Sequence, residues 1–230
     1  MLDKLYKRDI LYLKGDEGVK KGVYSITLRD DVVRELDRAA YLAGATRSGM
    51  INRLLAESLG LATPEKRKVN IFSELARHIA EDGNFLVRSG ENDSQFAVRG
   101  SIRFKYNPSI QYSVAVYPEI GEYFGELRVN LRTQNSSLIA CLDEFFELWC
   151  EIERRLLGVR EASFRGGRYV RRLRNTGGSA ECLGEAAAGY IRALHSAISL
   201  YFAALGEPEL AAERTAKIFR NYLTEEKNYV

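Results

Sequence analysis

Apolar and polar positions alternate with a period of two over residues 23–28, which predicts a short β-strand. Tyr24, Ile26 and Leu28 fall on one face, and this face is apolar enough to belong on a core. The opposite face carries three short and mostly hydroxylated positions, Val23, Ser25 and Thr27. A lone strand leaves its backbone N–H and C=O groups unpaired, so we expect this strand to pair with that of a second copy of the chain.

Directly after this strand the apolar spacing becomes that of a helix. Asp30 or Asp31 is expected to cap a first helix that runs to about Ala43, and Gly44 ends it because glycine tolerates the left-handed conformation. Thr46 is expected to cap a second helix. The predicted buried positions are Val33, Leu36, Ala40 and Ala43 on the first helix and Met50, Ile51, Leu54, Leu55 and Ser58 on the second.

In order and length these elements resemble the ribbon-helix-helix family, the Arc/MetJ/CopG type of DNA-binding domain. The resemblance is carried by YSITLRDDVVRELDRAA and GATRSGMINRLL, and it covers residues 20–62. It implies that two chains pair their strands into an antiparallel ribbon that enters the major groove of double-stranded DNA. It further implies base contacts from Val23, Ser25 and Thr27 and phosphate contacts from Lys20, Lys21, Thr46, Arg47 and Ser48.

Several of these residues also have simpler interpretations. Ser25 and Thr27 are ordinary solvated residues if the strand meets no DNA, and Thr46 and Ser48 are explained as a helix cap with or without a phosphate. Val23 departs from the family pattern, in which the first groove-facing position is often long and polar. A valine can touch a thymine methyl group but cannot make bidentate hydrogen bonds to a base. We therefore expect modest sequence readout, with Lys20 and Lys21 adding phosphate affinity.

A proline and a run of charges in LATPEKRK indicate a domain boundary near residues 61–68. We expect an N-terminal extension at residues 1–19, the ribbon-helix-helix domain at 20–62, a linker at 63–69 and a larger domain at 70–230. The larger domain would serve oligomerisation, a protein partner or an effector.

The periodicity of the larger domain predicts an α+β fold. A short helix from Asn70 or Ser73 to Ala80 is followed by a three-stranded antiparallel meander at about 95–106, 110–117 and 123–132. Three helices follow, at about 136–157, 180–205 and 207–225.

Two basic features stand out in this domain. The outward face of the meander would carry Arg99, Arg103, Lys105, Arg128 and Arg132, with Glu126 as its acid. This face is either solvated or able to meet phosphate or another anionic partner. The second feature is the glycine-bounded segment 159–178, interpreted as a flexible loop. It offers possible accessory DNA contacts from Arg165, Arg168, Arg171, Arg172 and Arg174, unless these arginines pair with acids of the same domain or of the dimer partner.

Composition excludes several other classes of protein. The net charge of +3 is mildly basic, so affinity for DNA has to come from local clustering. Two histidines without metal-ligand spacing and the absence of nucleophile or phosphate-loop motifs predict no catalytic residues, no metal and no cofactor. Three cysteines without a CxxC pair, no membrane-length apolar run and no signal-peptide pattern fit a cytoplasmic protein that does not associate with membranes.

These observations together predict a homodimeric, sequence-specific DNA-binding protein that regulates transcription, without enzymatic activity, and that can assemble further on repeated sites. The alternative is an antitoxin or a partition-type adaptor whose large C-terminal domain binds a protein partner. A small-molecule effector bound by the second domain is a third interpretation.

Overall fold

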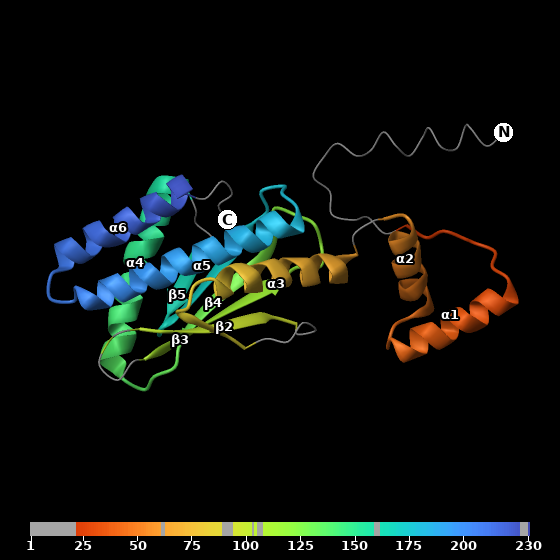
Figure 1. Cartoon of the computed structure of the whole chain (residues 1–230), viewed down its shortest axis with the longest axis horizontal. Coiled ribbons are helices and arrows are strands. Elements are labelled where there is room, and N and C mark those ends of the chain that lie inside the picture. Colours follow the sequence, from red (N-terminus) through yellow and green to blue (C-terminus); the bar gives the residue numbers. More distant parts are fainter. Residues whose placement is uncertain are drawn as a thin grey trace. The chain divides into compact units, whose positions relative to one another are not determined.

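In the computed structural model the described residues are 22–60, 63–88, 94–102, 104, 108–158, 162–225 and 230. They belong to two compact units that meet in the sequence at Pro64 and Glu65 (Figure 1). The described part of the chain forms six helices and one six-stranded antiparallel sheet, which confirms the α+β class. Among these residues no helix combines the length and apolarity that crossing a membrane requires.

The first unit is a pair of helices, α1 (Asp30–Leu42) and α2 (Arg47–Ser58). Arg29 rather than an aspartate holds the cap position of α1, and Asp30 and Asp31 lie in the first turn, where negative charge favours the helix dipole. Gly44 reverses the chain with φ of 59°. Thr46 caps α2, since its hydroxyl accepts a hydrogen bond from the Gly49 amide at 3.1 Å.

The core of this unit is small. Leu36, Ala40 and Met50 are buried, with Ala39 and Ile51 packed against them. The expected burial of several further positions is wrong for the single chain, because two short helices leave one side uncovered. Val33 is half-buried, and Ala43, Leu54, Leu55 and Ser58 are exposed.

The second unit is built on the six-stranded sheet, with strand order β1-β2-β3-β4-β6-β5. Its strands are β1 (Phe85–Val87), β2 (Phe96–Ser101), β3 (Ser109–Val116), β4 (Tyr123–Leu131), β5 (Ala162–Arg165) and β6 (Arg168–Arg174). The strands of the predicted three-stranded meander overlap β2, β3 and β4, but the sheet has six strands, so the meander is only its middle part. The sheet extends beyond it on both sides.

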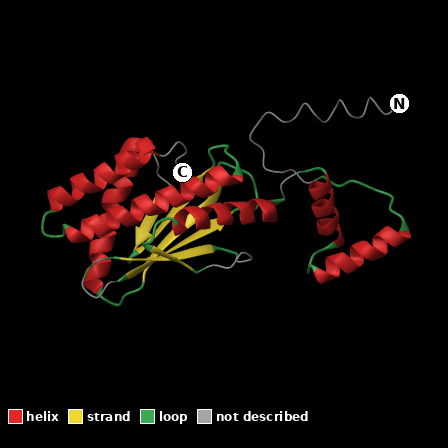
Figure 2. Ribbon diagram, viewed as in Figure 1, coloured by secondary structure: helices red, strands yellow, loops and turns green. Residues whose placement is uncertain are grey.

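Helices α3 (Pro64–Ala80), α4 (Ser136–Leu157) and α5 (Ala180–Ala203) cover one face of this sheet, and α6 (Pro208–Glu225) packs on α4 and α5 (Figure 2). Phe72 of α3 contacts Phe96 of β2, and Phe146 of α4 stacks on Tyr169 of β6. The backbones of α3 and α5 approach closely at Gly184, where a Cβ would lie 2.7 Å from the Ile71 carbonyl oxygen.

Two predicted loops are regular structure instead. Residues 64–69, expected to form a linker, are the first turns of α3, because Pro64 stands at the start of a helix, where its missing N–H costs nothing. Segment 159–178, expected to be a flexible loop, contains the β5–β6 hairpin. Gly166 and Gly167 form its two-residue turn, with φ of 62° and 71°. The Asp143 carboxylate accepts hydrogen bonds from both glycine amides, at 2.9 and 2.8 Å.

Candidate functional site

Residues 22–29, which include the predicted strand, form no strand ladder within the single chain. The apolar face of this segment is open: Tyr24 is 85% exposed and Ile26 is 58% exposed. Val23, Ser25 and Thr27, the residues expected to face bases, are exposed as well. A segment of alternating character with both faces uncovered has its backbone and its apolar side chains available to a partner.

The start of α2 offers a small group of donors. The Thr46 hydroxyl is used by the cap, and the Met50 amide donates to the Thr46 carbonyl. The amides of Arg47 and Ser48 therefore remain available, pointing from the positive end of the helix dipole.

The side chain of Arg47 has a structural role in the single chain. Its guanidinium donates to both Asp37 oxygens at 2.6 Å, joining α1 to α2, and it lowers the pKa of the Asp37 carboxyl. Because Asp37 already compensates its charge, Arg47 is a weaker phosphate ligand than its sequence position indicates. Lys20 and Lys21, also expected to contact phosphate, lie outside the described residues.

One predicted DNA contact is wrong. Arg171 is 1% exposed, because it lies on the face of β6 that the helices cover. Its Nε lies 2.8 Å from the buried Glu153 carboxylate, and its Nη2 donates to the Val230 carbonyl at 2.6 Å. An arginine held in this way cannot reach a phosphate.

Arg171 belongs to a buried polar cluster. Glu153 also accepts hydrogen bonds from the hydroxyls of Tyr169 and Tyr190, each at 2.9 Å. The Trp149 indole N–H donates to the Tyr190 hydroxyl at 2.8 Å. Burial raises the pKa of Glu153, and Arg171 and the two tyrosine hydroxyls act in the opposite direction. The cluster fastens β6 to α4 and α5.

The other predicted arginines gather on the uncovered face of the sheet. Arg165, Arg168, Arg172 and Arg174 are exposed, and they alternate with the half-buried inward positions of β5 and the buried positions of β6. Strand β6 pairs with β4, so these arginines share one face with Arg128 and with Arg99 of β2. Two basic features that are separate in the sequence are therefore one surface. Arg132 is exposed just after β4, and Arg103 and Lys105 lie outside the described residues.

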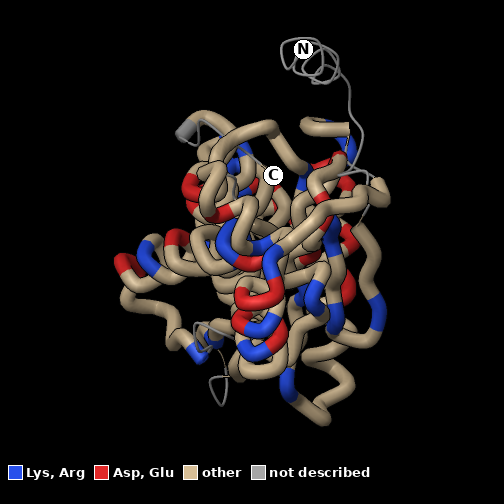
Figure 3. Tube along the Cα trace, turned by 90° about the vertical axis from the view of Figure 1, so that its right-hand side faces the viewer, with Lys and Arg blue, Asp and Glu red and all other residues tan. Residues whose placement is uncertain are grey.

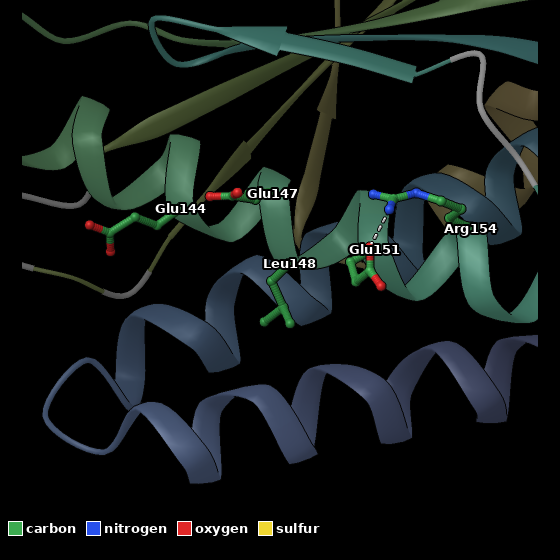
Figure 4. A pocket seen from close by; sticks show the side chains of 5 residues that line it. All are labelled: Glu144, Glu147, Leu148, Glu151 and Arg154. Atoms are coloured by element: carbon green, nitrogen blue, oxygen red, sulfur yellow. Dashed lines mark ion pairs between the residues drawn. The ribbon is translucent and has the colours of Figure 1, made fainter.

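Other candidate chemistry is sparse in the described part of the chain. No group of three or more possible metal ligands occurs among the described residues. His195 is buried, with its Nδ1 2.9 Å from the Tyr112 hydroxyl. A shallow pocket on α4 is lined by Glu144, Glu147, Leu148, Glu151 and Arg154, and Arg154 is paired with Glu151 at 2.7 Å (Figure 4). All its lining residues come from a single helix, so it converges on no reacting centre.

Basic and acidic residues are interspersed along the described chain (Figure 3). The concentrations of positive charge are therefore local, and the sheet face is one of them. Comparison of the chain with protein-family models, curated proteins and solved structures gives no match.

Proposed function

We propose that the chain is a homodimeric, sequence-specific DNA-binding protein that regulates transcription. Two copies would pair their residues 23–28 into an antiparallel ribbon and insert it into the major groove, as in the ribbon-helix-helix proteins that residues 20–62 resemble. The observation that carries the proposal is the uncovered apolar face of this segment, which stands before a helix pair with almost no core of its own.

The apolar side chains of the first unit support a second copy as the missing partner. In addition to Tyr24 and Ile26, Leu54 is 46% exposed and Leu55 is 53% exposed. Because each leucine is only about half exposed, covering the remainder would contribute about 1 kcal/mol for each of them. A two-fold symmetric dimer covers the same surface on both chains, and strand pairing satisfies both backbones at once.

The opposite face supports DNA as the target. Val23, Ser25 and Thr27 would project from the paired ribbon into the groove, where hydroxyls bond base edges and the valine touches a thymine methyl group. The Arg47 and Ser48 amides at the start of α2 would hold a backbone phosphate on each side.

The alternation of the strand gives a direct test of the dimer. Ile26→Lys puts a charge on the face that would be buried, whereas the control Thr27→Lys puts the same charge on the neighbouring position of the other face. Sedimentation of the full chain is expected to give a monomer for Ile26→Lys and a dimer for both the wild type and Thr27→Lys. Equal masses for the two variants would contradict the proposed ribbon.

Selection of fragments from a random pool of duplex DNA tests the function itself. We expect a recovered motif made of two-fold related half-sites, because a symmetric dimer presents the same ribbon to both DNA strands. Recovery of fragments without a shared motif would contradict sequence-specific regulation.

A further inference from the structure

The two faces of the six-stranded sheet differ sharply in character. One face carries buried apolar side chains, including Val98, Tyr112 and Val129, beneath the helices. No helix of the described second unit packs on the opposite face, most of whose residues are half-exposed or exposed. Polar side chains predominate on it, beside the apolar Leu86, Ala97, Ala115 and Val170.

The strand registers align one row of polar side chains across the uncovered face. Arg99 lies opposite Gln111, Gln111 opposite Asn130, Asn130 opposite Arg168, and Arg168 opposite Arg165. The row crosses five strands and spans about 19 Å at the usual separation of neighbouring strands. Every member of the row is a hydrogen-bond donor.

Positive charge dominates this face. Arg128 lies beside the row, two residues from Asn130, and Arg172 and Arg174 lie four and six residues from Arg168 along β6. Glu126 is the one acid among the described strand residues of the face. Glu126 is bound to Arg128 at 2.5 Å, and the Arg172 guanidinium lies 4.3 Å from the centre of the Tyr123 ring. Arg165, Arg168 and Arg174 form no ion pair with a described residue.

Two of these arginines repel each other. Arg165 and Arg168 are direct cross-strand partners beside the tight Gly166-Gly167 turn, and like charges in this relation destabilise a hairpin. The Asp143 carboxylate bonds the turn amides and keeps the hairpin closed despite this repulsion. A bound anion would relieve it.

The chemistry of the face favours phosphate over an apolar partner. Arginine, serine, asparagine and glutamine are residue types that commonly bond DNA phosphates, and Gln111, Asn130 and the exposed Ser163 lie among the arginines of this face. Its described large aliphatic side chains are Leu86 at the β1 edge and the half-buried Val170, fewer than the apolar anchors of most protein interfaces.

We propose that this uncovered face, from Arg99 to Arg165, is a second DNA-binding surface that holds the phosphate backbone of a duplex without reading its sequence. Over about 19 Å of axis one DNA strand presents about five to six phosphates, which is comparable to the number of side chains in the donor row.

The inference rests on the proposed function, since the ribbon would deliver the duplex. Both surfaces belong to one chain, so DNA bound by the first is at high effective concentration for the second. Val23, Ser25 and Thr27 offer few base contacts. Phosphate contacts from the sheet face would therefore raise the affinity for DNA without raising its sequence specificity.

The test is the salt dependence of DNA binding by the full chain. The face variant replaces the three arginines of the row, Arg99, Arg165 and Arg168, by glutamine. The control variant replaces Arg214, Lys217 and Arg220 of α6 by glutamine. It loses the same three positive charges, but on a different surface. Binding to a selected duplex and to an unrelated duplex is measured between 50 and 200 mM salt, with unfolding curves to verify both folds.

We expect the face variant to lose up to about 2.7 from the slope of log K against log salt, about 0.9 for each lost phosphate contact. Over this salt range the wild-type affinity would then fall about 40-fold more than that of the face variant. Its preference for the selected duplex should stay unchanged. A face variant with the slope of the control variant would overturn the proposal.

The outcomes also separate this proposal from the proposed function. A selected motif, together with equal salt slopes for the face and control variants, would support sequence-specific binding and contradict the role of the sheet face. If selection gives no motif but the face variant still has a flatter salt slope, the sheet face would be supported and sequence-specific regulation contradicted. Loss of binding to single-stranded DNA or RNA alone, with duplex binding unaltered, would contradict the duplex as the ligand. A change of oligomeric state with an unaltered slope would contradict a role in DNA contact.

Discussion

Arg171 and Arg172 are neighbours in the sequence with opposite environments. Arg171 is buried against Glu153, while Arg172 is exposed on the other face of β6 and lies over Tyr123. Burial disfavours the charged form of Arg171, but Tyr190 and Glu153 outweigh this effect and raise the pKa of the guanidinium. Arg171 is therefore charged in the core, and its charge opposes the effect of burial on the Glu153 carboxyl, whose pKa burial raises.

Removing one partner should expose this dependence. Arg171→Met leaves the Glu153 carboxylate buried without a counter-charge, so we expect the free energy of unfolding to fall by about 3–5 kcal/mol. Arg172→Met should cost less than about 1 kcal/mol, because that side chain is exposed. Urea unfolding measures both. Replacing Glu153 by leucine in the Arg171→Met background should recover part of the loss, and an additive double variant would contradict a coupled pair.

His195 should make stability depend on pH. Its ring contacts Phe85 and the backbone of Gly100, and burial lowers its pKa, with Asp82 acting weakly in the other direction. The unfolded chain therefore binds a proton more readily than the native one, so this group reduces stability as pH falls through about 6.5. Unfolding at pH 7.5 and 5.5 should show a smaller difference for His195→Asn than for the wild type. Identical differences would contradict a neutral buried imidazole.

At the scale of elements, the β5–β6 hairpin contributes to both the buried polar cluster around Glu153 and the basic face of the sheet. Its turn is fastened to α4 by Asp143, its inward side supplies Tyr169 and Arg171 to the core, and its outward side supplies the exposed arginines. The segment is thus a paired hairpin, whereas its glycines and arginines predict a flexible loop.

Loss of the turn contact should be measurable. Asp143→Ala removes a charged acceptor from the Gly166 and Gly167 amides, and we expect a loss of about 1.5–3 kcal/mol in the free energy of unfolding. Glu147→Ala removes an exposed acid one turn further along the same helix and should change stability by less than about 0.5 kcal/mol. Comparable losses in the two variants would show that Asp143 does not hold the turn.

The sequence predicted the elements whose periodicity is clean and missed those whose pattern is interrupted. Between Leu138 and Ile152 apolar residues recur at helical spacing, and this pattern predicts α4 with nearly its observed ends. In RYVRRLR the alternation is hidden, because the inward position between Tyr169 and Leu173 is an arginine rather than an apolar residue. Only the fold shows that Glu153, far away in the sequence, makes this position tolerable. The β5–β6 strands and the single basic face were therefore not predictable from pattern alone.

At the scale of the whole molecule, the two units differ in how complete their hydrophobic cores are. The second unit has a continuous core, whereas the first buries Leu36, Ala40 and Met50 and leaves its strand segment uncovered. We propose that a second chain completes the first unit, which then reads DNA, and that the uncovered sheet face of the second unit adds sequence-independent affinity. The modest net charge of +3 is compatible with this division, because the positive charge that matters is local.

The most direct measurement is the ratio of affinities for a selected and an unrelated duplex, compared between the wild type and Ser25→Ala/Thr27→Ala. Both hydroxyls are exposed, so the double variant should fold normally. If the ribbon reads bases, the ratio should fall about tenfold or more, since each chain of the dimer loses its polar base contacts. The control Asn52→Ala, an exposed position on α2, should keep the ratio within about twofold. An unchanged ratio in Ser25→Ala/Thr27→Ala would contradict recognition of DNA by this strand.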